Sequence, residues 1–491
     1  MASFSNAAPQ SAPGASAAVG HTAAGHTLPN SIPLSIFPMK IDKFAVYVCG
    51  LPSVGKTGIA RRLARYLEFF HAVPVKYFNA SEYRRRTFGL WREATMFDNS
   101  ASKDKLAQIS EQIFSEMEEW MESSSNAVAI LDSGSLLATA AQRRLATKAM
   151  HKLGAKVLFI ECWKDQSEEV QTPYKSPDYE GVSRDDADRD YRIRVEKYRA
   201  MYQEVDGDSA FGESKLSFLK CNHSKNDFVL HRVDGWLQLK IAHFLMNLRT
   251  EPHQFFLSRH GQSEYNAVGR IGGDSGLSAH GLAYAHKLAE FVEEKICHDD
   301  ETGRARPARL WTSTMRRTKE TAQFIKQSKL AIRDDDDPTL EHEWVQMRPR
   351  AWHHLDELFA GACDGMTYEE IEVQFPEEFE RRSKDKLAYR YPRGESYLDV
   401  IARLEPIVIE MERHREPLLI VGHQGILRII YGFYMGLSRA ETPYVSIPLN
   451  VVVQLAPTPF ECSAERHELY DGLVGEDGQN EPHTQRDPQS H

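Results

Sequence analysis

Short apolar runs alternate with longer amphipathic stretches through most of the first half of the chain. Each short run has the length of one strand, and in each longer stretch apolar residues recur every three to four positions, as in a helix that buries one face. The expected strands are 44–49, 75–79, 127–132 and 156–161, and the expected helices are 56–70, 103–121, 138–153, 188–202 and one that ends at residue 248. This alternation predicts a parallel sheet with covering helices, so the first half should be an α/β domain.

The same alternation starts again after a break at residues 251–253. A second α/β domain is therefore predicted. Its expected strands are 254–258, 308–312 and 417–422, and the helices between them are expected at 278–295, 315–325 and 396–413.

The two ends of the chain differ from the rest in composition. The first 40 residues are rich in Ala, Ser, Gly and Pro, so they cannot bury enough apolar surface to offset the entropy lost on ordering. The residues after Cys462 are mostly polar. We predict a disordered tail at 1–40, an α/β domain at 41–250, a second one at 251–462 and a polar disordered tail at 463–491.

Length, charge and cysteine content narrow the class of protein. A chain of 491 residues with 41% hydrophobic residues suits two globular domains, and its net charge of -10 argues against a nucleic-acid partner. No apolar run approaches the roughly 18 residues of a membrane span. The first 39 residues contain no Lys or Arg, which disfavours a secretory or mitochondrial leader. Six cysteines without metal-ligand spacing fit a reducing cytosol, so we expect a cytoplasmic protein without a membrane partner.

A phosphate-binding motif lies between the first strand and the first helix. The segment 50–57 reads GLPSVGKT and satisfies G-x-x-x-x-G-K-[ST], in which backbone N–H groups surround nucleotide phosphates. Asp132 ends a later strand, as a magnesium ligand of a nucleotide site would. Mg-ATP is therefore the expected cofactor of the first domain, with Thr57 and Asp132 as the expected metal ligands. The predicted nucleotide-binding residues are Gly50, Gly55, Lys56, Thr57 and Asp132.

The second domain has a histidine at the end of each of two strands. Arg259 and His260 follow strand 254–258, and His423 follows strand 417–422. If these strands are neighbours in one parallel sheet, their carboxyl ends bring both imidazoles to the edge where α/β proteins bind ligands. A neutral imidazole can attack phosphorus in line, and guanidinium groups such as those of Arg259 and Arg317 stabilise the equatorial oxygens. The pattern predicts a phosphoryl-transfer site.

Arg-His-Gly with a distant Gly-His resembles the histidine phosphatase superfamily, which includes the phosphoglycerate mutases. Across residues 253–461 the motifs RHGQSEYN, GRIGGDSGLS, WTSTMRRT, DGMTYEEI, YRYPRGESY, RLEP and GHQGILR resemble the bisphosphatase domain of the 6-phosphofructo-2-kinase/fructose-2,6-bisphosphatase family. The resemblance implies a phosphoglycerate mutase-like α/β fold. It also implies hydrolysis of fructose 2,6-bisphosphate to fructose 6-phosphate and phosphate through a phosphohistidine at His260.

The resemblance also implies roles for other residues of the second domain. Glu357 would protonate the leaving oxygen, and His423 would stabilise the charge of the transferring group together with Arg259 and Arg317. A basic cluster of Arg382, Lys386 and Arg428 would hold the 6-phosphate. One position departs from the family, since Gln262 stands where Glu is usual, and we expect it to tune the site only. The implied substrate-binding residues are Asn266, Gly272, Tyr368, Arg382, Lys386, Tyr397, Gln424 and Arg428.

The first domain resembles the kinase domain of the same family, a P-loop NTPase-like fold. The motifs YFNASEYRR, SPDY, HRV and HFLMN carry this resemblance, and it implies binding of fructose 6-phosphate by Arg84, Arg194 and Tyr198. Three departures fall on the same active site. The segment 132–135 reads DSGS, where the family usually has DATN. Bifunctional members of the family have a lysine three residues before SPDY, where this chain has Pro173, and its nearest lysine is Lys175. The segment before 96–99 is out of register with the family's substrate loop. They favour an ATP-binding domain with weak or absent kinase turnover.

Several alternatives stay open at this point. The chain is interpreted first as a bisphosphatase with an impaired kinase half, and second as a fully bifunctional enzyme. A non-catalytic sugar-phosphate and nucleotide sensor is disfavoured because His260, Glu357 and His423 are all present. A broad phosphatase or mutase is disfavoured by the P-loop and the predicted 6-phosphate cluster. The resemblance further implies a homodimer whose small-molecule partners are sugar phosphates and ATP.

Overall fold

The computed structural model describes residues 42–89, 100–123, 126–164, 176–207, 215–299, 302–333, 340–458 and 461–471. Its first half contains a six-stranded sheet with the order β2-β3-β1-β4-β5-β6, parallel except for β6. Its first four strands lie where the sequence predicts them. Fully buried runs such as FAVYVC suit the strands of a sheet that is covered on both faces. The strands are β1 (Phe44–Cys49), β2 (Val75–Asn79), β3 (Val128–Asp132), β4 (Lys156–Cys162), β5 (Ser217–Asn222) and β6 (Asp227–His231).

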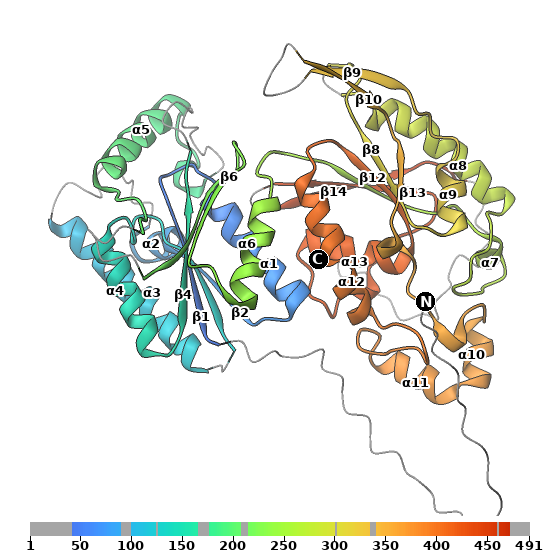
Figure 1. Cartoon of the computed structure of the whole chain (residues 1–491), viewed down its shortest axis with the longest axis horizontal. Helices are drawn as coiled ribbons and strands as arrows, with labels where there is room; N and C mark the ends of the chain where they lie inside the picture. Colours follow the sequence, from blue (N-terminus) through green and yellow to red (C-terminus); the bar gives the residue numbers. More distant parts are fainter. Residues whose placement is uncertain are drawn as a thin grey trace, which may run out of the picture. The chain divides into compact units, whose positions relative to one another are not determined.

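Helices cover both faces of this sheet (Figure 1). Apolar residues of α1 and α6 pack on one face, whereas those of α3 and α4 pack on the other. The predicted helices are present with shifted ends. The helices of this half are α1 (Lys56–His71), α2 (Ala80–Phe88), α3 (Ser100–Ser123), α4 (Ala140–Lys152), η2 (Pro177–Tyr179), α5 (Arg184–Met201) and α6 (Gly235–Asn247).

The second half contains another six-stranded sheet, with the order β11-β8-β12-β7-β13-β14. The first four strands of this order are parallel, and β13 and β14 are antiparallel to their neighbours. Residues 463–468, which we expected in a polar tail, instead belong to the edge strand β14. The strands are β7 (Phe255–Arg259), β8 (Arg309–Thr312), β11 (Pro349–Ala351), β12 (Leu418–Gly422), β13 (Val451–Pro457) and β14 (Cys462–Glu468), with a separate ribbon of β9 (Lys329–Arg333) and β10 (Glu341–Val345).

Helices again cover both faces of the sheet, with α8 and α9 on one side and α12 and α13 on the other (Figure 1). Smaller helices, including α10 and α11, lie in the connections. The helices of this half are α7 (Glu264–Ala267), α8 (Ala279–Phe291), η4 (Val292–Ile296), α9 (Arg316–Ala322), η5 (His353–Leu355), η6 (Gly361–Cys363), α10 (Tyr368–Gln374), α11 (Pro376–Lys384), α12 (Tyr397–Arg413), α13 (Gln424–Met435) and η7 (Thr442–Tyr444).

One apolar core is shared by the two halves. Buried side chains of α1 and α6 belong to the same cluster as those of α12 and α13. Phe69 and Phe433, for example, pack edge to face with ring centroids 5.6 Å apart. Each half therefore covers an apolar helical face of the other.

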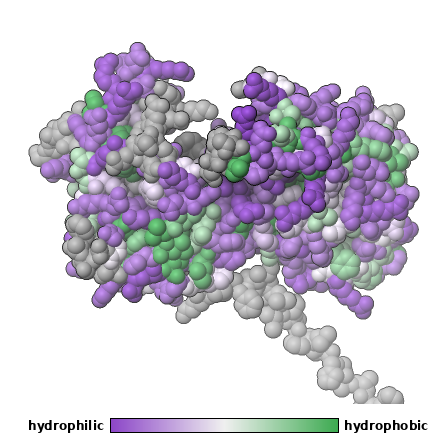
Figure 2. Space-filling model, turned by 45° about the horizontal axis from the view of Figure 1, so that its top comes forward, coloured by the Kyte–Doolittle hydropathy of each residue, from purple (hydrophilic) through white to green (hydrophobic). Residues whose placement is uncertain are grey.

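The face of the molecule seen in Figure 2 is mainly hydrophilic. On the face shown in Figure 2, apolar residues gather only in separate patches among polar ones. Among the described residues, no helix is both long and apolar enough to cross a membrane.

Candidate active site

His260 and His423 lie at the carboxyl ends of neighbouring parallel strands. β7 pairs with β12 so that Arg259 is opposite Gly422, and the backbone N–H of His260 donates to the carbonyl of Gly422 at 3.0 Å. The two imidazole rings have centroids 5.1 Å apart. The predicted convergence of the two strand ends is thus confirmed, and it produces a pair of buried histidines.

The contacts of His260 define the state of its ring. Nδ1 lies 2.8 Å from the carbonyl oxygen of Gly261, which can only accept, so Nδ1 carries the proton. Nε2 accepts from Nε of Arg317 at 3.2 Å and therefore keeps its lone pair. Burial and the guanidinium groups of Arg317 and Arg259 hold the pKa of His260 well below its usual range. The ring is neutral near pH 7 and has a nucleophilic nitrogen at Nε2.

His423 is held by one hydroxyl group, which a second hydroxyl group holds in turn. Its Nε2 lies 2.8 Å from Oγ of Ser313, which is 2.9 Å from Oγ1 of Thr318. Burial, together with the charge of Arg317 and the neighbouring His260, lowers the pKa of His423 well below its usual range. Ser313 was not among the predicted residues, although it directly follows the strand in the WTST motif.

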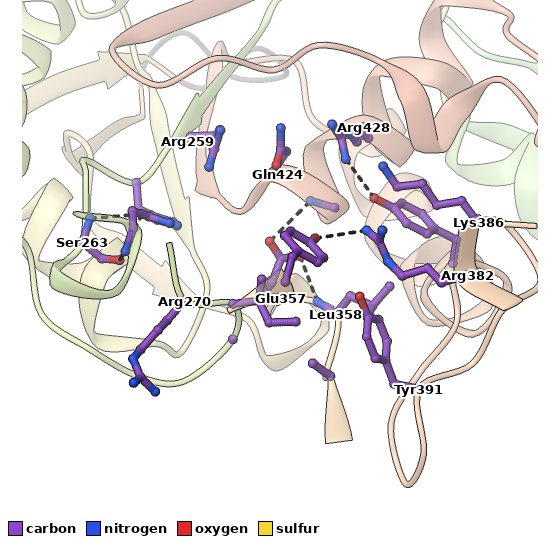
Figure 3. A pocket seen from close by; sticks show the side chains of 18 of the residues that line it. Arg259, Ser263, Arg270, Glu357, Leu358, Arg382, Lys386, Tyr391, Gln424 and Arg428 are labelled. Carbon is purple, nitrogen blue, oxygen red and sulfur yellow. Dashed lines mark hydrogen bonds between the residues drawn. The ribbon is translucent and has the colours of Figure 1, made fainter. Parts of the chain in front are cut away.

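Glu357 lies in the segment between η5 and η6 and contributes to the same cavity as His260. One carboxylate oxygen accepts from the backbone N–H of Leu358 at 2.9 Å, and the other from that of Gly425 at 3.4 Å (Figure 3). A Cβ atom on Gly425 would lie 2.7 Å from Oε1 of Glu357. A glycine at the start of α13 is therefore needed to give this carboxylate its position.

A cavity of about 130 Å³ joins these groups to the predicted substrate-binding residues. Its described lining contains six cationic side chains and a single carboxylate, that of Glu357, so it favours a ligand with several negative charges. His423 is not among the residues that line it, although its ring is adjacent to that of His260. The cations are Arg259, Arg270, Arg317, Arg382, Lys386 and Arg428, and the other predicted residues in the lining are Asn266, Gly272, Tyr368, Tyr397 and Gln424.

The cations of the cavity form two groups. Figure 3 shows Arg382, Lys386 and Arg428 together on one side of Glu357, with Arg270 on the other. Tyrosine hydroxyls orient this first group, since Arg428 donates to Tyr397 at 3.2 Å and Arg382 donates to Tyr368 at 3.1 Å. The predicted basic cluster is thus a spatial group, distinct from the guanidinium groups next to His260.

Some lining residues were not predicted. Arg270 donates to the carbonyl of Gly365 and lies 3.6 Å from the carboxylate of Glu370, and Tyr391 lines the wall near Arg382. Arg270 belongs to the GRIGGDSGLS motif, which was the available sequence signal. Gln262 is absent from the described lining, and its Oε1 accepts from Ser278, the residue that precedes α8.

The P-loop residues of the first half lie at the amino end of α1. Gly50 has φ 128°, and a Cβ there would lie 2.1 Å from the carbonyl oxygen of Cys162, so this loop requires glycine. Thr57, in the first turn of α1, donates to Asp132 at 2.5 Å. Burial lowers the pKa of Lys56 and raises that of Asp132. A loop, a lysine, a hydroxyl and a carboxylate suited to a magnesium nucleotide therefore come together.

The predicted sugar-binding residues of the first half converge on Asp178 and on the altered DSGS segment. Arg84 donates to Asp178, and Nη1 of Arg194 is 4.0 Å from the same carboxylate. The hydroxyl of Tyr198 donates to the carbonyl of Gly134 at 2.7 Å. The other two departures, at Pro173 with Lys175 and before 96–99, lie outside the described residues.

Comparison with known proteins identifies both halves. Residues 35–252 match the family model of 6-phosphofructo-2-kinase, and residues 255–468 match that of the histidine phosphatase superfamily, branch 1. A fructose-2,6-bisphosphatase of Saccharomyces cerevisiae is 34% identical over 85% of this chain and 87% of its own. A 6-phosphofructo-2-kinase/fructose-2,6-bisphosphatase of Caenorhabditis elegans is 35% identical over 86% of this chain and 88% of its own, and one of Aquarana catesbeiana is 33% identical over 86% and 83%.

Proposed function

Because the chain belongs to the 6-phosphofructo-2-kinase/fructose-2,6-bisphosphatase family, we propose that it removes the 2-phosphate of fructose 2,6-bisphosphate by a phosphohistidine mechanism. Its first half is a 6-phosphofructo-2-kinase-like domain and its second half a histidine phosphatase domain. The observation that carries the proposal is a neutral His260 with an unprotonated Nε2, which accepts from Arg317, in a cavity lined by cations.

In the first step Nε2 of His260 attacks the phosphorus atom of the 2-phosphate. The bond from phosphorus to the sugar O2 breaks as the bond from phosphorus to nitrogen forms, and Glu357 donates its proton to O2. Arg259 and Arg317 balance the charge on the equatorial oxygens, and His423, whose ring lies beside that of His260, stabilises the charge of the transferring group. Fructose 6-phosphate is the product of this step.

In the second step a water molecule attacks the phosphorus atom of the phosphohistidine. The carboxylate of Glu357 accepts a proton from this water, and the phosphorus–nitrogen bond breaks to release phosphate. His260 returns to the neutral state, with its Nδ1 proton still donated to Gly261. One carboxyl group thus acts first as an acid and then as a base.

The second cationic group supports the choice of a bisphosphate as substrate. Arg382, Lys386 and Arg428 lie away from His260, where a second phosphate on the same sugar would be held. A monophosphate would leave this group without an anion. We therefore expect weak activity on 3-phosphoglycerate, which a broad phosphatase or mutase would accept.

A labelling experiment tests the phosphatase. Fructose 2,6-bisphosphate with ³²P in its 2-phosphate should give an acid-labile phosphoprotein and then free phosphate. His260→Ala should abolish both, whereas His286→Ala, at an exposed position of α8 stacked on Phe324, should retain both. Release of phosphate by His260→Ala at the wild-type rate would contradict the mechanism.

For the first half we propose binding of Mg-ATP, with kinase turnover weak or absent. Gly55 and Lys56 would hold the phosphates, and Thr57 with Asp132 would hold Mg²⁺. The hydrogen bond of Tyr198 to the backbone carbonyl of Gly134 places the DSGS segment beside a residue matched to the sugar site, and the changed side chains of this segment support altered chemistry there. A fully bifunctional enzyme is the alternative.

The alternative is tested with His260→Ala, since this variant cannot consume fructose 2,6-bisphosphate. It is incubated with Mg-ATP and fructose 6-phosphate, and fructose 2,6-bisphosphate is followed with time. Accumulation would establish a bifunctional enzyme. A folded, ATP-binding variant without product supports a bisphosphatase with a regulatory nucleotide domain, while failure to bind either ligand would contradict the proposed role of the first half.

A homodimer and a cytoplasmic location complete the proposal. The edge strand β6 has Val229 and Leu230 side chains exposed by 48% and 43%, which offers a surface for pairing with a second copy. The six cysteines are free thiols, which fits a reducing compartment. Light scattering of the purified chain tests the first point, and cell fractionation the second.

A further inference from the structure

The segment that carries Glu357 has no helix or strand structure over residues 356–360. It lies between two short 3-10 helices, and neighbouring side chains are exposed, with His353 at 84% and Phe359 at 51% of their accessible surface. Leu355 is its buried anchor. A general acid must be held within a fraction of an ångström of its working position, so other groups have to fix this segment.

Arg403, in the second turn of α12, reaches the backbone of this segment from outside the cavity. Its Nη1 donates to the carbonyl of His354 at 2.7 Å and to that of Asp356 at 2.9 Å, and lies 3.4 Å from that of His353. The guanidinium group thus binds three carbonyl groups among the four residues that precede Glu357. Arg403 does not line the cavity.

Glu395, just before α12, holds both the arginine and the other side of the segment. Nε and Nη2 of Arg403 donate to its two carboxylate oxygens, each at 3.0 Å. The backbone N–H of Phe359 donates to the same carboxylate at 3.0 Å, and the N–H of Glu395 donates to the carbonyl of Phe359 at 2.9 Å. One ion pair therefore fixes the backbone before and after Glu357.

A further contact shows why this second attachment matters. Thr314, after β8, donates through its N–H and hydroxyl to the carboxylate of Asp356 at 2.7 to 2.9 Å. This contact holds the segment through the side chain of the residue directly before Glu357. The Arg403–Glu395 pair adds attachments at the backbone before and after Glu357, which restrict the direction of its carboxyl group.

We propose that Arg403, paired with Glu395, is a positioning residue for the general acid Glu357, an inference that rests on the proposed phosphatase function. The role requires the planar fork of arginine, because a single group has to bind two carboxylate oxygens and the adjacent carbonyl groups at once. A lysine at this position keeps the charge but cannot make both sets of contacts.

The experiment measures the rate of phosphoenzyme formation at His260 in a single turnover with labelled fructose 2,6-bisphosphate. Arg403→Lys should lower this rate by about 10²-fold, the effect of a displacement of about 1 Å of a reacting group, with KM near the wild-type value. In a Glu357→Gln background the same substitution should cause no further loss, because the acid that it positions is gone. Arg390→Lys is the matched control, since Arg390 pairs with Asp399 in the first turn of α12 but does not contact the Glu357 segment.

The outcomes separate the two proposals. Absence of a phosphoenzyme in the wild-type chain would overturn the proposed function itself. A wild-type rate in Arg403→Lys, or a loss that multiplies with that of Glu357→Gln, would overturn the positioning role and leave the phosphatase intact. If Arg403→Lys does not fold, as judged by circular dichroism, Glu395→Gln tests the positioning role instead, because it keeps an acceptor for Phe359 but removes the ion pair. The rate of phosphoenzyme formation in Glu395→Gln should fall about tenfold or more, again only when Glu357 is present.

Discussion

Glu405 of α12 is an acidic residue that joins the second half to the first, and replacing it by glutamine should lower the stability of the folded chain. Its Oε1 accepts from the hydroxyl of Tyr66 and from Nζ of Lys240, each at 2.7 Å, and lies 3.4 Å from Nε2 of His71. All three partners belong to α1 or α6 of the first half. Glu405→Gln keeps the size and the hydrogen-bond acceptor but removes the charge.

The size of the effect follows from the carboxyl group's pKa. Although burial opposes ionisation, the hydrogen bonds from His71, Lys240 and Tyr66 together lower the pKa of Glu405 from 4.5 to about 2. At about 1.36 kcal/mol per pH unit this corresponds to about 3 kcal/mol in favour of the folded state at pH 7. Partial screening by solvent reduces the effect, so we expect Glu405→Gln to lose about 1 to 2 kcal/mol.

The sign of the pH dependence follows from a folded-state pKa that lies below the unfolded-state value. The contribution is fully present above pH 4.5 and is lost as the pH falls from 4.5 towards 2, because only the unfolded chain takes up a proton in that range. The difference between wild type and Glu405→Gln should therefore be constant from pH 8 to about pH 5 and then narrow.

Urea unfolding followed by tryptophan fluorescence measures this difference at a series of pH values. Glu380→Gln serves as the control, because its pair with Lys384 on α11 is exposed and should contribute little. An equal midpoint for wild type and Glu405→Gln at pH 7 would refute the reasoning. So would a difference that stays constant down to pH 3, since it would then not come from the ionised carboxylate.

Three further predictions concern the two sites. Arg428→Ala should raise KM for fructose 2,6-bisphosphate by about 10- to 100-fold with a smaller change in kcat, because it removes a charge-assisted contact worth about 1.5–3 kcal/mol. Steady-state kinetics measures both constants, and an unchanged KM would show that Arg428 does not bind the substrate. Gly425→Ala should lower kcat by about 10²-fold while the unfolding midpoint stays near wild type, because the new methyl group would displace only the carboxylate end of the Glu357 side chain, 2.7 Å away. A wild-type kcat would show that the carboxylate does not need this position. Lys56→Ala should abolish the heat of Mg-ATP binding in titration calorimetry, and retained binding would place the nucleotide elsewhere.

The elements that carry the chemistry were readable in the sequence because they are strongly apolar. Strands 254–258 and 417–422 have apolar centres, FFL and LLIV, and a histidine follows each within two residues, so neighbouring parallel strands bring both histidines to one edge. β5 and β6 were not predicted, because their polar positions break the run and β6 is largely exposed. Most of β14 was predicted to be a polar tail because its residues are largely polar and exposed. An edge strand that is held by backbone hydrogen bonds needs no apolar pattern.

The supporting contacts were beyond sequence reasoning because they join distant segments. Arg403 and the carbonyl of His354 are 49 residues apart, and Ser313 and His423 are 110 residues apart. No local periodicity encodes such pairs, and a lone arginine or serine in a helix or loop is ordinarily a surface residue. The resemblance supplied the groups that meet the substrate, whereas only the fold could identify the residues that hold them.

The shared core explains how the first half could persist while its chemistry changes. α1 begins at Lys56 of the nucleotide loop and ends at His71 beside Glu405, so the helix that carries the loop also covers the apolar faces of α12 and α13. α12 in turn begins at Tyr397 in the phosphatase cavity and carries Arg403 towards the Glu357 segment. Removing the first half would expose this apolar face and loosen the helix that positions the acid. Substitutions in the DSGS segment remove none of these contacts, so selection on the phosphatase alone would preserve the fold of the first half whether or not the kinase site turns over.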